Sequence, residues 1–141
     1  ESLKRLIQVF ATDLRGEVDL ASLMTPLQDE KEILNPNVVK VITDLKGKAL
    51  YFSRAALPFL REPDAEVTYF KHKGVYAFRK KALVEFADLP IGPLEKAESI
   101  EAIRFLEHQR VLQMVETPND SIGIDTEEDL QKANALFKTR S

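Results

Sequence analysis

Apolar residues near the start of this chain recur with the spacing of an amphipathic helix. Over residues 2–13, Leu3, Leu6, Ile7 and Phe10 fall on one face, and polar residues occupy the other. A glycine follows shortly afterwards, as it often does where a helix ends. The pattern therefore predicts a helix that packs one side against a core.

Short segments rich in β-branched and aromatic residues, bounded by Pro, Asn or Gly, predict the strands of a sheet. Pro26 is expected to stop the first strand, and the Asp-Leu-Lys-Gly-Lys sequence at 44–48 predicts a hairpin turn between the second and the third. The expected strands are residues 18–25, 38–43, 49–53, 72–78 and 111–116, with a brief extended segment at 122–124.

Helical patterns alternate with these strands. Residues 29–34 predict a short charged helical turn, residues 80–87 a short helix, and residues 93–109 a longer one. A terminal helix is expected to begin at Thr126, because an N-cap residue there precedes three acids. The expected buried side of the longer helix is Leu94, Ala97, Ile100, Ile103 and Leu106. Alternating strands and helices indicate an α/β fold, and the hairpin makes the sheet mixed.

Composition narrows the class of protein. The 141 residues suffice for a single domain, and 44% hydrophobic with 30% charged residues are typical of a globular protein. Twenty basic and 23 acidic residues give a net charge of -3, which argues against non-specific nucleic-acid binding. Cysteine is absent and no apolar run is long enough to span a membrane, so we expect a cytoplasmic protein.

Two polar residues stand where segments of the predicted sheet end. Asp125 follows the apolar Ile-Gly-Ile segment, where a carboxylate can hold a divalent cation on a phosphate; it can equally cap the helix that follows. Arg54 ends the strand 49–53, where a guanidinium can bind a carboxylate or phosphate with two parallel hydrogen bonds; it can also be an ordinary surface arginine.

Other candidates lie on predicted strands and helices. His72 and Tyr76 are four residues apart, so in a strand both point to one face and can bind a polyhydroxylated ligand or simply line a half-buried surface. Glu95, Glu98 and Glu101 recur along the predicted helix. Such a run can accept hydrogen bonds from sugar hydroxyls, but it is usually a solvated face that pairs with nearby lysine and arginine, in this helix Lys96 or Arg104.

Five short segments of this sequence resemble the 3-deoxy-manno-octulosonate cytidylyltransferase family, also called CMP-KDO synthetases. The segments occur in the family's order and span nearly the whole chain, which makes the resemblance specific. They are 35–41 (NPNVVKV), 49–54 (ALYFSR), 71–79 (KHKGVYAFR), 93–101 (PLEKAESIE) and 123–130 (GIDTEEDL).

The resemblance implies a Rossmann-like nucleotidyltransferase fold, of which this chain is a part, and a homodimer. It implies transfer of CMP from CTP to 3-deoxy-manno-octulosonate (KDO), with release of pyrophosphate, for lipopolysaccharide biosynthesis. By position, Arg54 would bind the sugar acid's carboxylate, and His72, Tyr76 and Glu101 would contact its hydroxyls. Asp125 would be the catalytic residue that binds Mg²⁺ near the α-phosphate.

Two further residues, Lys40 and Asn37, are expected close to this pocket as substrate-binding residues by the same resemblance. One departure concerns the sugar: the family usually has glutamine where this chain has Ala102, and alanine cannot replace that amide. A cytidylyltransferase for another acidic sugar, 8-amino-KDO or a sialic acid, therefore stays open, as does a non-catalytic dimerisation module.

The chain opens at Glu1, without an initiator Met and already inside a helical pattern. The family's glycine-rich loop, which holds the triphosphate, and its Gln-Gly-Asp segment have no counterpart in the 141 residues. We therefore expect residues 1–141 to form one domain, the C-terminal sugar-binding and dimerisation half of a cytidylyltransferase. Because the CTP-binding part is absent, we expect the chain alone to be catalytically inactive.

Overall fold

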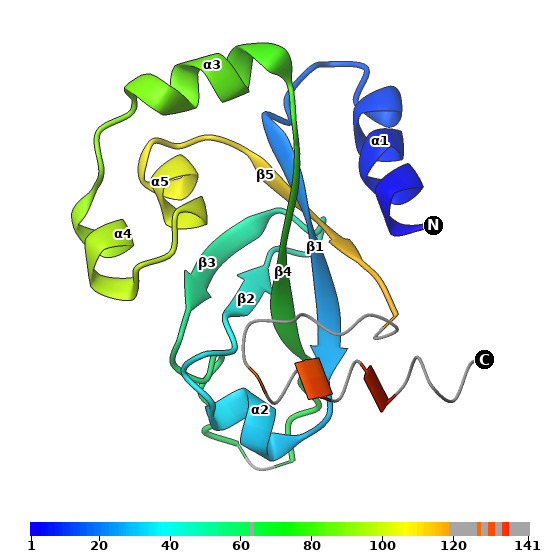
Figure 1. Ribbon diagram of the computed structural model, residues 1–141, viewed down its shortest axis with the longest axis vertical. Helices are drawn as coiled ribbons and strands as arrows, with labels where there is room; N and C mark the ends of the chain where they lie inside the picture. Colours follow the sequence, from blue (N-terminus) through cyan, green and yellow to red (C-terminus); the bar gives the residue numbers. More distant parts are fainter. Residues whose placement is uncertain (63, 119–126, 128–129, 132–133, 136–141) are drawn as a thin grey trace.

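The computed structural model describes residues 1–62, 64–118, 127, 130–131 and 134–135. Five strands form one mixed sheet in the order β3-β2-β4-β1-β5 (Figure 1). The neighbours β1 and β5 run parallel, and the other pairs are antiparallel. The strands are β1 (Leu20–Leu27), β2 (Lys40–Thr43), β3 (Ala49–Ser53), β4 (Tyr69–Phe78) and β5 (Leu112–Glu116). The predicted α/β class with a mixed sheet is confirmed.

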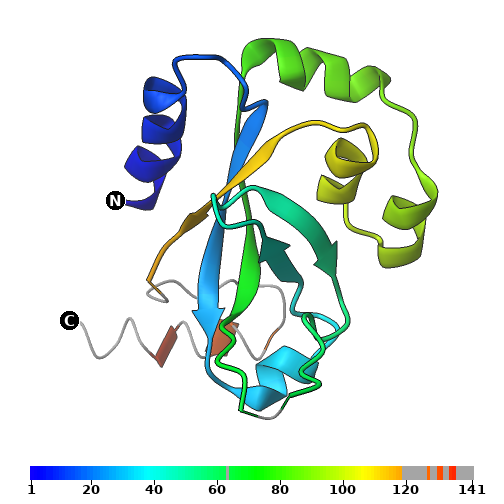
Figure 2. The same cartoon turned by 180° about the vertical axis from the view of Figure 1, so that it is seen from behind.

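Helices cover both faces of this sheet, as Figures 1 and 2 show from opposite sides. They are α1 (Ser2–Thr12), α2 (Glu30–Leu34), α3 (Lys80–Asp88), α4 (Pro93–Glu98) and α5 (Ala102–Glu107). Within the described residues, none has the length and apolar character that crossing a bilayer requires. The predicted helices 2–13, 29–34 and 80–87 are confirmed to within about one residue.

Strand β1, which lies between β4 and β5, is buried on both faces because its side chains alternate between two cores. Leu20 and Met24 face a large cluster that includes Phe52 of β3 and residues of α5. Ala21 and Leu23 face a smaller cluster closed by Leu6 of α1. The strand therefore reads as a nearly continuous apolar run, and it anchors the sheet.

Pro26 lies inside β1 and does not stop it as predicted. The residue pairs with Phe70 of β4, but the pairing of β1 with β5 already ends at Met24. Beyond Met24, no strand among the described residues pairs with this side of β1. A residue without a backbone N–H is tolerated there, since proline is accepted at the edges of sheets.

The predicted helix 93–109 is two helices, because the chain turns sharply at Ser99. This residue has a φ of 53°, the left-handed conformation that ends α4. The buried stripe also differs from the prediction: Leu94 and Ala97 are exposed, whereas Glu95 is buried. The break directs the start of α5 back into the large core, where Ile103 is fully buried.

The sheet curls so that its two outer strands approach each other. The hairpin turn between β2 and β3 is confirmed at 44–48, and Gly47 in it has a φ of 79°, which favours glycine. The carbonyl of Gly47 accepts a 2.8 Å hydrogen bond from the backbone N–H of Met114 in β5, and Lys48 forms a bridge with Gln113. The turn therefore covers part of the outer edge of β5.

Candidate functional site

Five of the residues predicted to bind substrate line one pocket of about 280 Å³. The pocket lies between β4 and the break that separates α4 from α5. Its polar lining comes from segments far apart in the sequence. The predicted residues in it are Asn37, Arg54, His72, Tyr76 and Glu101.

Arg54 is held in place by backbone carbonyls on two sides of the pocket. Its Nε donates to Glu98 O at 2.7 Å, and its two terminal nitrogens donate to Pro36 O at 2.9 Å and to Ser99 O at 3.3 Å. A guanidinium has five N–H groups, so two are left by these three bonds. The side chain therefore presents a fixed positive charge with two N–H groups that have no acceptor among the described residues, which suits a carboxylate.

The carboxylate of Glu98 fixes the end of β3 next to this arginine. It accepts from Ser53 Oγ at 2.6 Å and from the backbone N–H of Arg54 at 2.9 Å. Glu98 is therefore neither a solvated surface acid nor a lining residue of the pocket. Glu95 instead pairs with Arg104, one of the partners considered from the sequence.

His72 of β4 lies between an aromatic ring of β3 and one of β4. Its ring packs edge-on against Phe52, with the centroids 4.8 Å apart, and against Tyr76 at 5.4 Å. Its Nε2 lies 2.9 Å from Ser22 Oγ. Burial lowers the pKa of His72 to about 4, because the low-dielectric surroundings disfavour the imidazolium. The ring is therefore neutral near pH 7.

Tyr76 lines the pocket, and its phenol is a neutral group near pH 7. Burial, and then the nearby negative charge of Glu101, raise the pKa of Tyr76 to about 12. The phenol is therefore available as both donor and acceptor. Glu101 is exposed and lines the pocket, where its carboxylate offers acceptors to hydroxyl groups. A neutral phenol, a neutral imidazole, a carboxylate and a guanidinium together form a polar site for a hydroxylated anion.

Lys40, expected among the substrate-binding residues, lies beneath the pocket and not in its lining. The side chain is 0% exposed. Its ammonium donates to Asn35 O at 2.9 Å, to Val38 O at 2.6 Å and to Arg54 O at 2.5 Å. Burial lowers the pKa of Lys40. The ammonium thus joins the loop that carries Asn37 to the end of β3 that carries Arg54.

Asp125, predicted as the catalytic metal ligand, lies outside the described residues, as do the extended segment 122–124 and Thr126 at the expected start of the terminal helix. In the part of the chain that the structure describes, no group of three or more His, Cys, Asp or Glu side chains lies together as a metal site requires. The magnesium prediction therefore stays a prediction.

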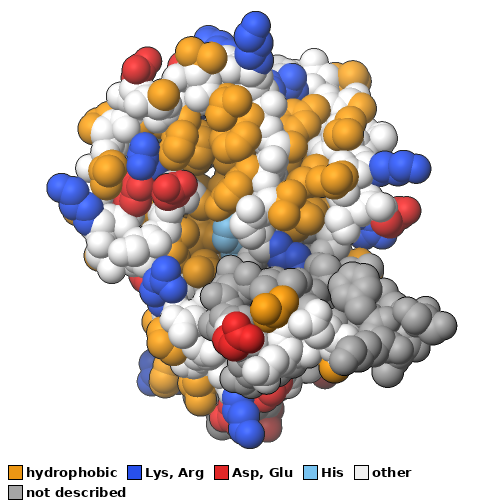
Figure 3. All heavy atoms as spheres, viewed as in Figure 1, with side chains coloured by type: hydrophobic (Ala, Val, Ile, Leu, Met, Phe, Trp, Pro, Cys, Tyr) orange, Lys and Arg blue, Asp and Glu red, His pale blue; other side chains and the backbone are white. Residues whose placement is uncertain are grey.

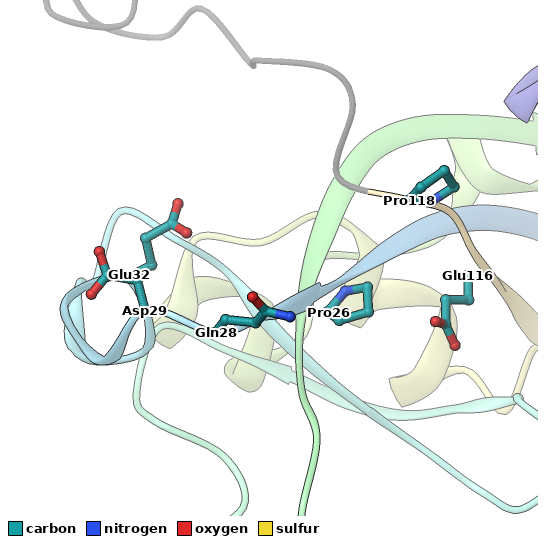
Figure 4. Close-up of a pocket in the computed structure, with 6 residues that line it drawn as sticks. All are labelled: Pro26, Gln28, Asp29, Glu32, Glu116 and Pro118. Carbon is teal, nitrogen blue, oxygen red and sulfur yellow. The ribbon is translucent and has the colours of Figure 1, made fainter.

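A second pocket, of about 350 Å³, opens at the ends of β1 and β5. Figure 4 shows Asp29 and Glu32 close together near α2, with Glu116 on the opposite side of the pocket. The carboxylate of Asp29 caps α2 through the N–H of Lys31 at 2.9 Å, and Glu32 pairs with Lys71 at 3.7 Å. Asp29 and Glu32 already have partners within the fold, so this pocket is a weaker candidate for a functional site than the first.

Ser22 is the residue near the site that the sequence-based reasoning missed. Its hydroxyl contacts His72 from the neighbouring strand. The available signal was its position, since Leu20, Ser22 and Met24 share one face of β1 and only Ser22 is polar.

Comparison with known proteins identifies relatives over nearly the whole chain. The sequence profile of the family described as "Cytidylyltransferase" matches residues 2–138. The 3-deoxy-manno-octulosonate cytidylyltransferase of Christiangramia forsetii is 54% identical over 136 residues, which cover 96% of this chain and 55% of that protein. The enzyme of the same name from Flavobacterium johnsoniae is 49% identical over 96% of this chain and 56% of its own length.

A solved structure agrees with these relatives. CMP:2-keto-3-deoxy-manno-octonic acid synthetase in complex with CTP superimposes with a TM-score of 0.90 and 30% sequence identity, covering 99% of this chain and 56% of that one. The chain therefore spans about half the length of the proteins it matches.

Proposed function

This chain belongs to the cytidylyltransferase family, and we propose that its pocket binds the sugar acid in the transfer of CMP from CTP to KDO. One observation carries the proposal. Arg54, His72, Tyr76 and Glu101, from separate parts of the sequence, line the same 280 Å³ pocket. Such convergence of unrelated polar residues is typical of a ligand site.

The contacts in the pocket match the groups of a sugar acid. The two N–H groups that Arg54 has left point to a bidentate bond with the carboxylate of KDO. His72, Tyr76, Glu101 and Asn37 supply donors and acceptors for hydroxyls. The many bonds that hold Arg54 limit its motion, and a fixed anchor orients the anomeric hydroxyl for reaction.

In the proposed reaction the anomeric oxygen of KDO attacks the α-phosphorus of CTP. A new P–O bond forms, the bond to the β-phosphate breaks, pyrophosphate leaves with the bonding electron pair, and the proton of the attacking hydroxyl passes to water. Asp125 would hold Mg²⁺, which would neutralise phosphate charge and lower the pKa of the attacking hydroxyl. Within the chain, Arg54 compensates the negative charge of the sugar beside the anionic nucleotide.

The cellular setting is part of the same proposal. We place the reaction in the cytoplasm, in lipopolysaccharide biosynthesis, with a homodimer as the working form. Apolar side chains gather on the half of the surface that carries α1 and α3 (Figure 3). The exposed apolar residues of these helices include Leu83 and Val84 of α3 and Ile7 of α1. Sedimentation of the chain at increasing concentration tests whether copies associate.

Calorimetric titration with KDO tests the pocket directly. We expect saturable binding to the chain and its loss in Arg54→Ala. Arg15→Ala is the matched control, because the Arg15 side chain is 87% exposed and outside the pocket lining. Equal binding by wild type and Arg54→Ala would overturn the assignment of the carboxylate site. Absence of binding in the wild type would favour a non-catalytic module.

The identity of the sugar is left open by position 102. Ala102 has no side-chain donor or acceptor, and it is 2% exposed in the large core, outside the pocket lining. Competition titrations with KDO, 8-amino-KDO and a sialic acid decide among the acidic sugars. We expect KDO to bind with the lowest Kd, and tighter binding of another sugar would change the substrate of the proposal.

A further inference from the structure

Ser22 is a fully buried hydroxyl on β1, and burial of a polar group is costly unless it is hydrogen-bonded. Three partners surround its Oγ: His72 Nε2 at 2.9 Å, Lys73 O at 3.1 Å and Val75 O at 3.0 Å. All three partners belong to one short stretch of β4, residues 72–75.

A β-bulge brings these partners together. In the pairing of β1 with β4, Ser22 is opposite Tyr76 but Leu23 is opposite Lys73, so the register shifts between adjacent residues of β1. Gly74 and Val75 are the additional residues of β4, and the backbone carbonyls of Lys73 and Val75 accept from the Ser22 hydroxyl. Bulges often redirect a side chain at a functional site.

The number of hydrogens that Ser22 can donate determines which ring nitrogen of His72 is protonated. A serine hydroxyl has one hydrogen to donate, and a backbone carbonyl can only accept. Two carbonyls compete for the Ser22 hydrogen, which leaves the oxygen lone pairs for a donor. Of the three partners of Ser22, only the His72 ring nitrogen can supply one. We propose that Ser22 is a positioning residue that holds His72 in the Nε2–H tautomer.

The second ring nitrogen of His72 then becomes an acceptor that faces the pocket. Within the described residues, Nδ1 has no hydrogen-bond partner, although every fully buried side-chain nitrogen or oxygen there has one. Nδ1 is therefore not fully buried, and His72 lines the pocket. In this tautomer Nδ1 accepts a hydrogen bond from a ligand hydroxyl. This consequence for the ligand rests on the proposed function, whereas the tautomer itself does not.

The tautomer has a consequence for recognition. Nδ1 of His72 and the carboxylate of Glu101 are both acceptors in the same pocket. They select a ligand that presents hydroxyl hydrogens, and they disfavour one that has an ether or a carbonyl at the same place. Specificity for free hydroxyls thus depends on a serine that is itself sealed from the ligand.

Nitrogen-15 NMR of the ring nitrogens in the ligand-free 141-residue chain tests the proposal. The chain has two histidines, so the spectrum of His108→Gln assigns the His72 signals. We expect the wild type to show a protonated Nε2 and an unprotonated Nδ1. A protonated Nδ1 in the wild type would refute the proposal, whatever the variants do.

Two variants distinguish the effect of the Ser22 hydroxyl from the effect of the side-chain volume. Ser22→Thr keeps the hydroxyl and is expected to keep the Nε2–H signal, whereas Ser22→Ala is expected to shift His72 toward a mixture of tautomers. An unchanged tautomer in a folded Ser22→Ala chain would contradict the positioning role. The wild-type spectrum keeps the proposal falsifiable even if Ser22→Ala does not fold.

Addition of KDO then distinguishes this proposal from the proposed function. We expect the Nδ1 resonance to move on saturation, and Ser22→Ala to bind KDO roughly tenfold more weakly, the usual effect of one hydrogen bond. If the Nε2–H tautomer is present and KDO does not bind, the function is wrong and the role of Ser22 stands. If KDO binds and the tautomer is Nδ1–H, the proposed function stands and the proposed role of Ser22 is wrong.

Discussion

The guanidinium of Arg54 donates from Nε to the backbone carbonyl of Glu98 at 2.7 Å, at the place where α4 ends. In an uninterrupted helix this carbonyl would accept from the N–H four residues later, at Ala102. Arg54 takes over that acceptor and also bonds Ser99 O. The residue proposed to bind the carboxylate therefore also stabilises the break that forms one wall of the pocket.

Arg54→Lys is expected to lose both roles, although it keeps the charge. An ammonium cannot reach three carbonyls and a ligand carboxylate with the geometry of a guanidinium. We expect at least a roughly tenfold loss in KDO affinity and a decrease of about 1–2 kcal/mol in the free energy of unfolding. Calorimetry and urea denaturation measure the two effects. Arg15→Lys serves as the control, and an equal effect in that variant would contradict the prediction.

Lys40→Met is expected to destabilise the fold strongly. Methionine matches the length of the side chain but leaves the carbonyls of Asn35, Val38 and Arg54 without their shared donor. The Asn35 carbonyl keeps the N–H of Val38 at 3.0 Å, so the carbonyls of Val38 and Arg54 are the two that lose their donor. Buried acceptors without partners cost about 1–3 kcal/mol each, so we expect a loss of roughly 2 kcal/mol or more. Denaturant unfolding measures it. Lys31→Met, at an exposed position of α2, should change stability little, and a similar loss in both variants would show that burial is not the cause.

The buried pair of Glu95 and Arg104 predicts a non-additive double mutant. Arg104 bonds both carboxylate oxygens, at 2.7 and 2.6 Å, and its guanidinium lies 4.4 Å from the centroid of the Phe86 ring. Arg104→Met leaves the carboxylate buried and uncompensated, at a cost of about 3–5 kcal/mol. Removal of both charges in Glu95→Met with Arg104→Met should cost less than Arg104→Met alone. A double-mutant cycle in urea measures the coupling, and strictly additive losses would argue against it.

The stability of the chain is expected to fall in mild acid because of His72. Its pKa is about 4 in the folded state and 6.5 in the unfolded state, so only the unfolded chain takes up this proton between those values. The stabilisation is complete above about pH 6.5 and decreases as the pH falls toward 4, by about 3 kcal/mol in all. Urea unfolding at pH 7 and pH 4.5 measures the change. The free energy of unfolding of His72→Gln should change less between these two pH values. A change equal to that of the wild type would contradict the assignment of the effect to His72.

Local patterns in the sequence predicted most of the sheet. The β-branched segments and the Asp-Leu-Lys-Gly-Lys turn identified strands and a hairpin because these features depend on neighbouring residues alone. The break at Ser99 was not predictable in this way. It depends on a side chain 45 residues earlier in the chain, Arg54, which takes the carbonyls that a continuous helix would use.

The site was predictable only in part, for a similar reason. The resemblance selected Arg54, His72, Tyr76 and Glu101, and the fold places them in one pocket. Spacing along the chain could not show that Lys40 lies under that pocket, because its carbonyl partners are assembled by the tertiary fold.

The bond between Met114 N–H and the carbonyl of Gly47 has a consequence for assembly. An open strand edge invites another chain to extend the sheet, and natural proteins block such edges. Here the β2–β3 hairpin occupies the middle of the outer edge of β5, so an incoming strand would first have to displace it. Association between copies through this region is therefore directed to contacts between side chains, whose chemistry can be selective, and away from backbone pairing, which accepts almost any sequence.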